Sequence, residues 1–319
     1  MRFAGFFALC IALVSCAYAQ QPWPARPVRL IIANSAGAAT DVAGRVFADM
    51  LSRRIERPVT VENRPGGDGL VGAQAVVGAA PDGYTLFFAS QSTVAIDPNL
   101  RKSMPFDPVR DFTAIAVICD STGPSGIFAH PSLPFSTLQG MVDYARAHPG
   151  KLTYATTVPI FSMLGEWLQR RAGIQMLEVP YKSTPQATQN AIAGQVALYI
   201  QAYGPMEQHL KAGKLRVLAV TVRQQDIAQI PTVADVFPGF SMLGSMFLLG
   251  PAGIAPDVVQ RINREADAVV KNPLFNQQLK RLRWQNSEGA RTPQGTVEFI
   301  RETRERWTRF IAETGRQPE

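Results

Sequence analysis

The sequence predicts an α/β protein made of two lobes with a ligand cleft between them. Short apolar runs rich in β-branched residues alternate with amphipathic helical stretches, a pattern typical of sheets covered by helices. The alternation occurs twice, on either side of a turn-forming break at residues 120–126. The chain has 319 residues, 46% hydrophobic and 18% charged, an ordinary composition with enough length for two domains.

The stretch at residues 28–55 carries the first predicted strand, loop and helix. An apolar run at 28–33 indicates a buried strand, and small residues at 34–39 form the loop. Thr40 or Asp41 then caps a helix with one apolar face. Unpaired N–H groups and the helix dipole favour an anion there, so we interpret this loop as a carboxylate pocket; an ordinary strand–helix turn is the alternative.

The other elements of the first lobe follow in order. Strands are expected at 59–61, 84–89 and 111–119, and a small-residue helix is expected at 70–80. Alternating strands and helices indicate a parallel sheet, and a polar cluster at 90–93 follows the strand at 84–89. Since ligands bind beyond the carboxyl ends of such strands, the loops at 34–39 and 90–93 are both expected to face the ligand.

The second lobe repeats the pattern, and the chain then returns to the first. Strands are expected at 127–129, 152–155, 175–179, 196–200 and 215–220, and helices at 136–147, 162–172, 185–193 and 205–212. A last strand at 246–249 precedes C-terminal helices at 256–270, 273–281 and 292–314. The strands at 111–119 and 246–249 are interpreted as crossings between the lobes, which would form a hinge. The predicted boundaries are 20–121 for the first lobe, 122–240 for the second and 241–319 for the return.

Residues 1–19 have the composition of a secretory signal peptide. A basic residue and an apolar core precede a small-x-small cleavage motif at 17–19. The mature chain is therefore expected to begin at Gln20 and to be located in the periplasm. Cys16 lies in a loose lipoprotein motif, so a lipid anchor is the less favoured alternative.

Charge and motif content argue against several classes of function. The formal net charge is +7, but glutamates are interleaved with the C-terminal arginines, which indicates a solvated helix face rather than a nucleic-acid surface. No phosphate-binding loop, dinucleotide fingerprint or nucleophile elbow occurs, and the three histidines lack metal-ligand spacing. Cys119, the one cysteine beyond the signal, is expected to be a buried hydrophobe. We predict no enzyme, no metal, no cofactor and no nucleic-acid partner.

Several motifs resemble one family of transport proteins. RPVRLIIANSAGAATDVAGRVFADML, near the start of the mature chain, and VENRPGGDGLVGAQAVVGAAPDGYTL, at 61–86, resemble the tripartite tricarboxylate transporter substrate-binding proteins, the TctC or Bug family. Shorter matches are MPFDPVRDFTAIA at 104–116, VPYK at 179–182, KAGKLRVLAVT at 211–221 and PTVADVFPGF at 231–240. The resemblance covers essentially the whole mature chain in order.

This resemblance implies a type II periplasmic binding protein of the Venus flytrap kind. Family members bind small organic acids, hold the carboxylate with backbone amides and water at the first strand–helix loop, and deliver the ligand to integral-membrane permease subunits. The chain is accordingly expected to be a monomeric periplasmic solute-binding protein for a small organic acid. An accessory ligand sensor that acts on a membrane sensor kinase is the alternative.

Candidate ligand-binding residues come from the loops expected at the cleft. They are Ser35, Ala36, Gly37, Ala38, Thr40, Asp41, Ser90, Gln91, Ser92, Thr156, Thr157, Val158, Tyr181 and Gln201. The alternative for Asp41 is helix capping, and for Tyr181 and Gln201 it is a place in the core or at the rim. The alternative for the loops is plain solvation.

Several departures from the family's pattern fall on these same loops. Ala38 replaces the second of two glycines, where a methyl group restricts positive φ and backbone approach. Gln201 stands in place of an aspartate, and Ser245 in place of a tryptophan. The departures favour a retained fold with a changed ligand.

Overall fold

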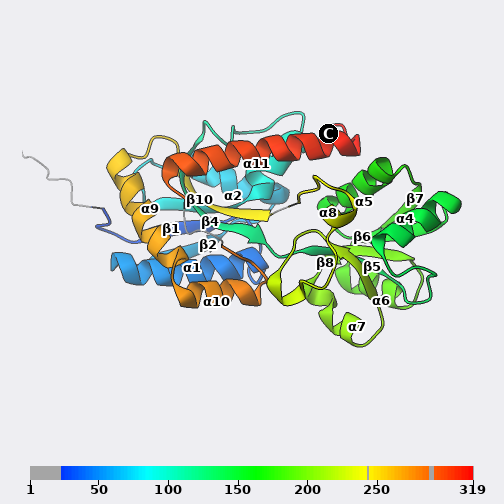
Figure 1. The fold of residues 1–319 in the computed structure, drawn as a ribbon. Coiled ribbons are helices and arrows are strands. Elements are labelled where there is room, and N and C mark those ends of the chain that lie inside the picture. The colour runs from blue at the N-terminus through cyan, green and yellow to red at the C-terminus, as the bar shows by residue number, and fades with distance from the viewer. Residues whose placement is uncertain (1–22, 243, 287–290, 319) are drawn as a thin grey trace, which may run out of the picture.

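The computed structural model describes residues 23–242, 244–286 and 291–318. The predicted signal peptide at 1–19, Cys16 and the predicted mature start at Gln20 lie outside the described residues. Two five-stranded sheets, each flanked by helices, form two lobes that lie side by side (Figure 1). The two-lobed α/β fold is therefore confirmed.

The first sheet has the strand order β2-β1-β3-β10-β4. Its members are β1 (Val28–Ile32), β2 (Val59–Asn63), β3 (Thr85–Ser90), β4 (Phe112–Thr122) and β10 (Gly244–Pro251). β1 pairs in parallel with β2 and β3, whereas β10 runs antiparallel to both β3 and β4. The carboxyl ends of β1, β2 and β3 therefore meet at one edge of this sheet.

The second sheet has the order β7-β6-β8-β5-β9. Its members are β5 (Ser125–Ala129), β6 (Leu152–Thr156), β7 (Met176–Pro180), β8 (Leu198–Ala202) and β9 (Arg216–Val220). β6 pairs in parallel with β7 and β8, but β5 is antiparallel to β8 and β9.

Both sheets are thus mixed, and the expectation of a parallel sheet is wrong for one strand in each. β5 and β10 are the strands that directly follow a passage of the chain from one lobe to the other. Two consecutive strands of one sheet can pair in parallel only if a crossover connection returns the chain over that sheet. β5 and β10 each follow an element of the other lobe, so no such connection precedes them.

Helices cover both sheets. Those of the first lobe are α1 (Ala39–Ile55), α2 (Leu70–Val77), α3 (Asp97–Leu100), α9 (Pro256–Val270) and α10 (Pro273–Arg281). Those of the second lobe are α4 (Leu138–Ala147), α5 (Pro159–Ala172), α6 (Thr184–Ile192), α7 (Glu207–Lys211) and α8 (Val233–Val236). Apolar stripes determine which face each helix buries; in α1, Phe47 packs between the rings of Phe88 and Phe275. Cys119 is fully buried, as predicted.

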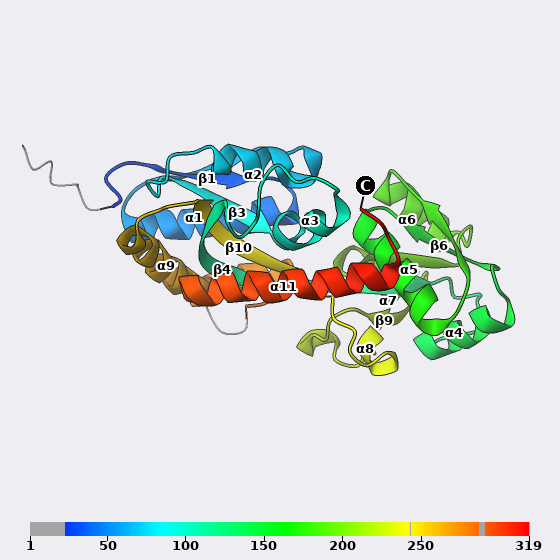
Figure 2. The same cartoon turned by 90° about the horizontal axis from the view of Figure 1, so that it is seen from above.

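The last helix, α11 (Pro293–Thr314), spans both lobes (Figure 2). Its first part packs on β4 and on the π-helical turn at Ser92–Ile96, and its last part packs on α5. On α5, Trp167 contacts the rings of Phe240 and Phe310 at centroid distances of 4.8 and 6.0 Å. The C-terminal helix therefore connects the lobes in addition to the two strand crossings.

Among the helices in the described part of the chain, none combines the length and apolar character that crossing a bilayer requires.

Candidate functional site

A cavity of about 850 Å³ lies between the two lobes. Its first-lobe lining comes from Ala33, Asn34, Ser35, Pro65, Gly66, Gly67, Gly69, Ser90, Ser92, Thr93, Ile96, Asp97, Leu100 and Arg101. Its second-lobe lining comes from Val158, Pro159, Ile160 and Met163, and the C-terminal tail adds Arg316 and Gln317. The volume and the mostly small or apolar lining suit a small organic ligand.

Segments that follow β1, β2 and β3 form the first-lobe wall. The segments after β2 and β3 can pack closely because Gly69 has no side chain. Gly69 has φ 99°, and a Cβ there would lie 2.8 Å from Oγ1 of Thr93. Asn34 is held by its carbonyl oxygen, which accepts a hydrogen bond from Nδ2 of Asn63 at 3.0 Å. The wall therefore lies at the carboxyl ends of parallel strands, where α/β proteins bind ligands.

The turn after β1 makes most of its hydrogen bonds within itself. The amide of Gly37 donates to Oδ2 of Asp41 at 2.8 Å, and the amide of Ala38 donates to the carbonyl of Ser35 at 3.2 Å. The helix begins at Ala39, earlier than predicted, and Ala38 is its N-cap with φ −64°. The methyl group of Ala38 therefore meets no conflict with positive φ. In this turn Ser35 lines the cavity, whereas Ala36, Gly37, Ala38, Thr40 and Asp41 are not part of the lining.

Asp41 is a buried carboxylate that holds this turn together. It accepts hydrogen bonds from Nε of Arg45 at 2.9 Å and from Nδ2 of Asn63 at 2.8 Å, in addition to the Gly37 amide. Burial acts to raise the pKa of Asp41, but the hydrogen bonds from Arg45, Gly37 and Asn63 outweigh it and lower the pKa below its usual 3.8. The side chain thus stays ionised near neutral pH and acts within the first lobe.

The polar cluster after β3 is helical rather than a loop. Ser90 ends β3, and residues Ser92–Ile96 form a π-helical turn. Ser90 and Ser92 line the cavity, while the side chain of Gln91 points elsewhere and is buried. Within the described part of the chain, Oε1 of Gln91 has no hydrogen-bond partner. Two of these three candidates are therefore at the cavity.

The second-lobe wall is the start of α5. Val158 is the N-cap and Pro159 occupies the first helical position, three residues earlier than the predicted start at Ser162. The first turn of this helix therefore borders the cavity. Pro159 has no N–H, and the amide of Phe161 donates to the carbonyl of Val158 at 3.0 Å, so the Ile160 amide and the helix dipole are the features that favour an anion there. Met163 lies one turn further along the same wall.

The other second-lobe candidates lie outside the lining and support it. Gln201 donates from Nε2 to Oγ1 of Thr157 at 3.0 Å and to the hydroxyl of Tyr199 at 2.9 Å. Thr156 donates to Oε1 of Glu178 at 2.6 Å. Tyr181 accepts from Nδ2 of Asn190 at 2.9 Å. These four candidates, Thr156, Thr157, Tyr181 and Gln201, thus make hydrogen bonds within the second lobe and are not part of the lining.

Apart from the start of α5, where Pro159, Ile160 and Met163 were not among the candidates, sequence reasoning missed three parts of the lining: the turn at 65–69, the segment at 96–101 and the tail at 316–317. The glycines at 65–69 follow a predicted strand, and that position was an available signal. The other two segments carry no local signal, because only the folded chain brings them to the cavity.

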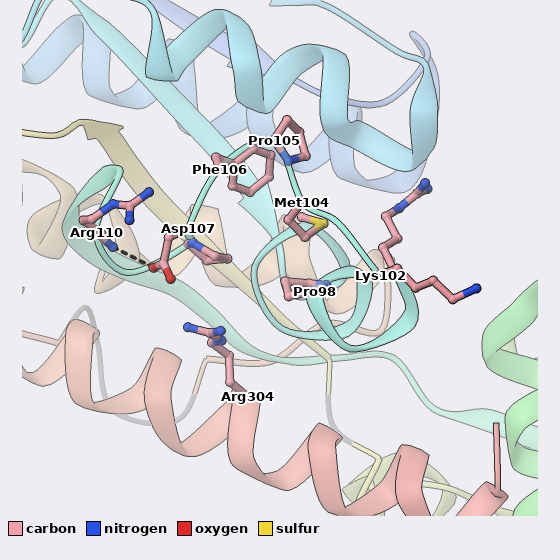
Figure 3. A pocket seen from close by; sticks show the side chains of 10 residues that line it. Pro98, Lys102, Met104, Pro105, Phe106, Asp107, Arg110 and Arg304 are labelled. Carbon is pink, nitrogen blue, oxygen red and sulfur yellow. Dashed lines mark hydrogen bonds between the residues drawn. The ribbon is translucent and has the colours of Figure 1, made fainter. Parts of the chain in front are cut away.

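A second hollow of about 430 Å³ lies between the loop at 98–110 and α11 (Figure 3). Arg304 points from α11 toward Asp107, whose Oδ1 accepts hydrogen bonds from the amides of Val109 and Arg110 at 2.8 and 2.9 Å. The Arg110 amide is the main cause of the lowered pKa of Asp107, and the charges of Arg304 and Arg110 add to it. The Asp107 carboxylate is itself the anion that faces Arg304. We therefore interpret this hollow as part of the packing of the loop on α11 and not as a binding site for a second anion.

Comparison with known proteins identifies the family of this chain. The sequence model described as "Tripartite tricarboxylate transporter family receptor" matches residues 43–316. A protein of Bordetella bronchiseptica from the group named UPF0065 is 29% identical over 312 residues, which cover 97% of this chain and 91% of that protein.

Solved structures have the same fold. R. palustris Rpa4515, solved with adipate, is 25% identical, with a TM-score of 0.77 over 93% of this chain and 100% of that chain. The periplasmic binding protein BugD is 23% identical, with a TM-score of 0.73 over 93% of this chain and 100% of that chain, and shows the fold alone. The chain therefore belongs to the tripartite tricarboxylate transporter receptor family.

Proposed function

We propose that this protein is a periplasmic receptor that binds a small organic acid in the cleft between its lobes and delivers it to a tripartite tricarboxylate-type permease. The observation that carries the proposal is the 850 Å³ cavity, which is lined from both lobes and bordered by the first turn of α5. Membership of a receptor family and the adipate bound to its relative Rpa4515 support an acid as ligand.

We propose that the acid group lies between Ser35 and the first turn of α5. Gly66, Gly67 and Gly69 leave room for the ligand there, and the Ile160 amide with the positive dipole end of α5 stabilises a carboxylate. Direct ligand contact by the candidates outside the lining stays a prediction. So do the lobe boundaries at 121/122 and 240/241, the signal peptide, the permease partner and the monomeric state.

The function proposed is binding and release without a chemical step. The polar side chains that line the cavity are serine, threonine, asparagine, glutamine, Asp97, Arg101 and Arg316, and the lining includes no histidine, cysteine or lysine among the described residues. A bound acid is therefore expected to be recovered unchanged after prolonged incubation with the protein.

The test is isothermal titration calorimetry of the purified mature chain against a panel of mono-, di- and tricarboxylates and aromatic acids. We expect saturable binding of at least one acid at one site per chain. Ile160→Trp should weaken it strongly, because the indole would occupy the space next to the first turn of α5 where the acid group is proposed to lie. Leu274→Trp is a matched control, because Leu274 is the second residue of α10, also follows a proline and is exposed.

Absence of binding by every acid in the panel would contradict the proposed function. So would wild-type affinity in the Ile160→Trp variant, since the acid would then bind elsewhere.

A further inference from the structure

The C-terminal tail is part of the cavity wall. α11 ends at Thr314, and Gly315 reverses the chain with φ 73° while its amide donates to the carbonyl of Ala312 at 3.1 Å. Figure 2 shows the tail turning back from the end of α11 into the space between α3 and α5. Arg316 and Gln317, the next two residues, both line the 850 Å³ cavity.

Contacts with α5 fix the position of this tail. Nε of Arg316 lies 2.8 Å from Oε2 of Glu166, and Nη2 lies 2.9 Å from Oε1. Such a paired contact fixes the plane of a guanidinium as well as its position. One turn earlier, Glu313 accepts a hydrogen bond from Nε1 of Trp167 at 2.5 Å. The guanidinium of Arg316 is therefore held at the cleft by the second lobe.

The cavity lining combines two arginines with apolar side chains. Arg101, which directly follows α3, lines it from the first lobe, and Arg316 lines it from the tail. The lining also includes the aliphatic side chains of Ile96, Leu100 and Ile160 and the thioether of Met163. Asp97 is the one acidic residue in the described lining. This composition suits an anion with an apolar body, and the position of Arg316 decides where an acid group can be bound.

We propose that Arg316 is a specificity-determining residue that binds the second acid group of an organic diacid. The inference rests on the proposed function and extends it, because the first carboxylate is assigned to the loops near Ser35 and the start of α5. Arginine suits this role since it stays charged and can bind two carboxylates by different edges. Glu166 takes the edge formed by Nε and Nη2, so the ligand carboxylate is assigned to the edge that carries Nη1. The C-terminal tail thereby distinguishes diacids from monoacids of equal length.

The test compares adipate with hexanoate, two six-carbon acids that differ in one terminal carboxylate. Calorimetry on the full mature chain is carried out for wild type, Arg316→Gln, Glu166→Gln and Arg309→Gln. Arg309 is an exposed arginine on the same helix, so its variant removes one positive charge without altering the cavity wall.

The proposal predicts that wild type binds adipate more tightly than hexanoate. Arg316→Gln should weaken adipate binding about tenfold or more, the usual effect of losing a hydrogen bond to a charged group, and should change hexanoate binding less than about twofold. Glu166→Gln keeps the guanidinium and should weaken adipate binding less than Arg316→Gln does. Arg309→Gln should leave both affinities unchanged.

Equal losses for the two acids in Arg316→Gln, or equal losses in Arg316→Gln and Glu166→Gln, would overturn the proposal by showing that the pair only holds the tail. Wild-type binding of hexanoate as tight as adipate, or of neither acid, would also overturn it. In that last case, binding of another acid from the panel leaves the proposed function standing, whereas failure of the whole panel removes both.

Discussion

At the turn after β1, the requirement for glycine falls on Gly37 and not on Ala38. Gly37 has φ 83°, with no atom within 4 Å of an added Cβ, whereas Ala38 has φ −64°. Gly37→Ala should therefore lower the free energy of unfolding by about 1–2 kcal/mol through backbone strain alone. Ala38→Gly should change it by less than about 0.5 kcal/mol, because glycine is tolerated at an N-cap at least as well as alanine. Urea unfolding checks both, and a larger loss for Ala38→Gly would contradict the assignment.

Asp41 should make the stability of the first lobe depend on pH. Its folded-state pKa lies below the ordinary 3.8, so its contribution is present above pH 3.8 and is lost as the pH falls through the folded value. Asp41→Asn should cost about 1–3 kcal/mol at pH 7, since the variant loses hydrogen bonds to a buried charge. The cost should shrink at pH 3, measured by urea unfolding at the two pH values.

The control for that change is Asp49→Asn in the same helix. Asp49 pairs with Arg53 at 2.8 Å on the exposed side of α1, so its loss should cost less than about 1 kcal/mol. Equal effects of the two substitutions at pH 7, or no difference between pH 7 and pH 3 for Asp41→Asn, would show that Asp41 does not hold the turn.

Among the elements, α11 makes side-chain contacts between the lobes that involve two tryptophans, Trp167 on α5 and Trp307 on α11 itself. Nε1 of Trp167 donates to Glu313, whereas Nε1 of Trp307 is buried and, in the part of the chain that the structure describes, has no hydrogen-bond partner. Both rings pack against Phe310. Trp167→Phe should cost about 1 kcal/mol or more beyond the cost of Trp307→Phe, because only the first loses a hydrogen bond to a charged group. Thermal unfolding of the two variants measures these losses. Equal losses, or a larger loss for Trp307→Phe, would contradict the prediction.

The ends of a helix could be predicted where a capping residue in the sequence determines them. The helices predicted to begin at 136 and 292 have Thr137 and Thr292 as their N-caps, and each hydroxyl accepts an amide hydrogen bond, at 3.0 and 3.1 Å. The predicted start of α5 at Ser162 is three residues too late. Pro159, which occupies the first helical position, is the local signal that marks the true start. That error left Ile160 out of the predicted site, although it lines the cavity.

For the whole molecule, the alternating pattern predicted two lobes but not the direction of every strand. The reversed strands β5 and β10 depend on where the chain crosses between the lobes, which no local pattern encodes. The cavity lining was predictable to the same extent. The predicted residues lie at or just after strand ends, where the sequence pattern places ligands: Ser35, Ser90, Ser92 and Val158. Arg101 and Arg316 reach the cavity only through tertiary packing, which no local pattern encodes.

Ligand binding should stabilise both lobes together. The cavity is lined from both lobes, and α11 packs on both, so a bound acid contacts a single connected structure. At an acid concentration 100 times the Kd, the free energy of unfolding should rise by about 2.7 kcal/mol. Hydrogen exchange should show added protection in β1–α1 and in α5. Protection confined to one lobe would contradict binding between the lobes.

The most direct test of a carboxylate bound between the lobes is a crystal structure of the mature chain with the tightest-binding acid of the panel. The account predicts density for the acid in the cavity, with a carboxylate between Ser35 and the first turn of α5. An acid bound outside this cavity, or a cavity filled by side chains while the acid is bound elsewhere, would contradict it.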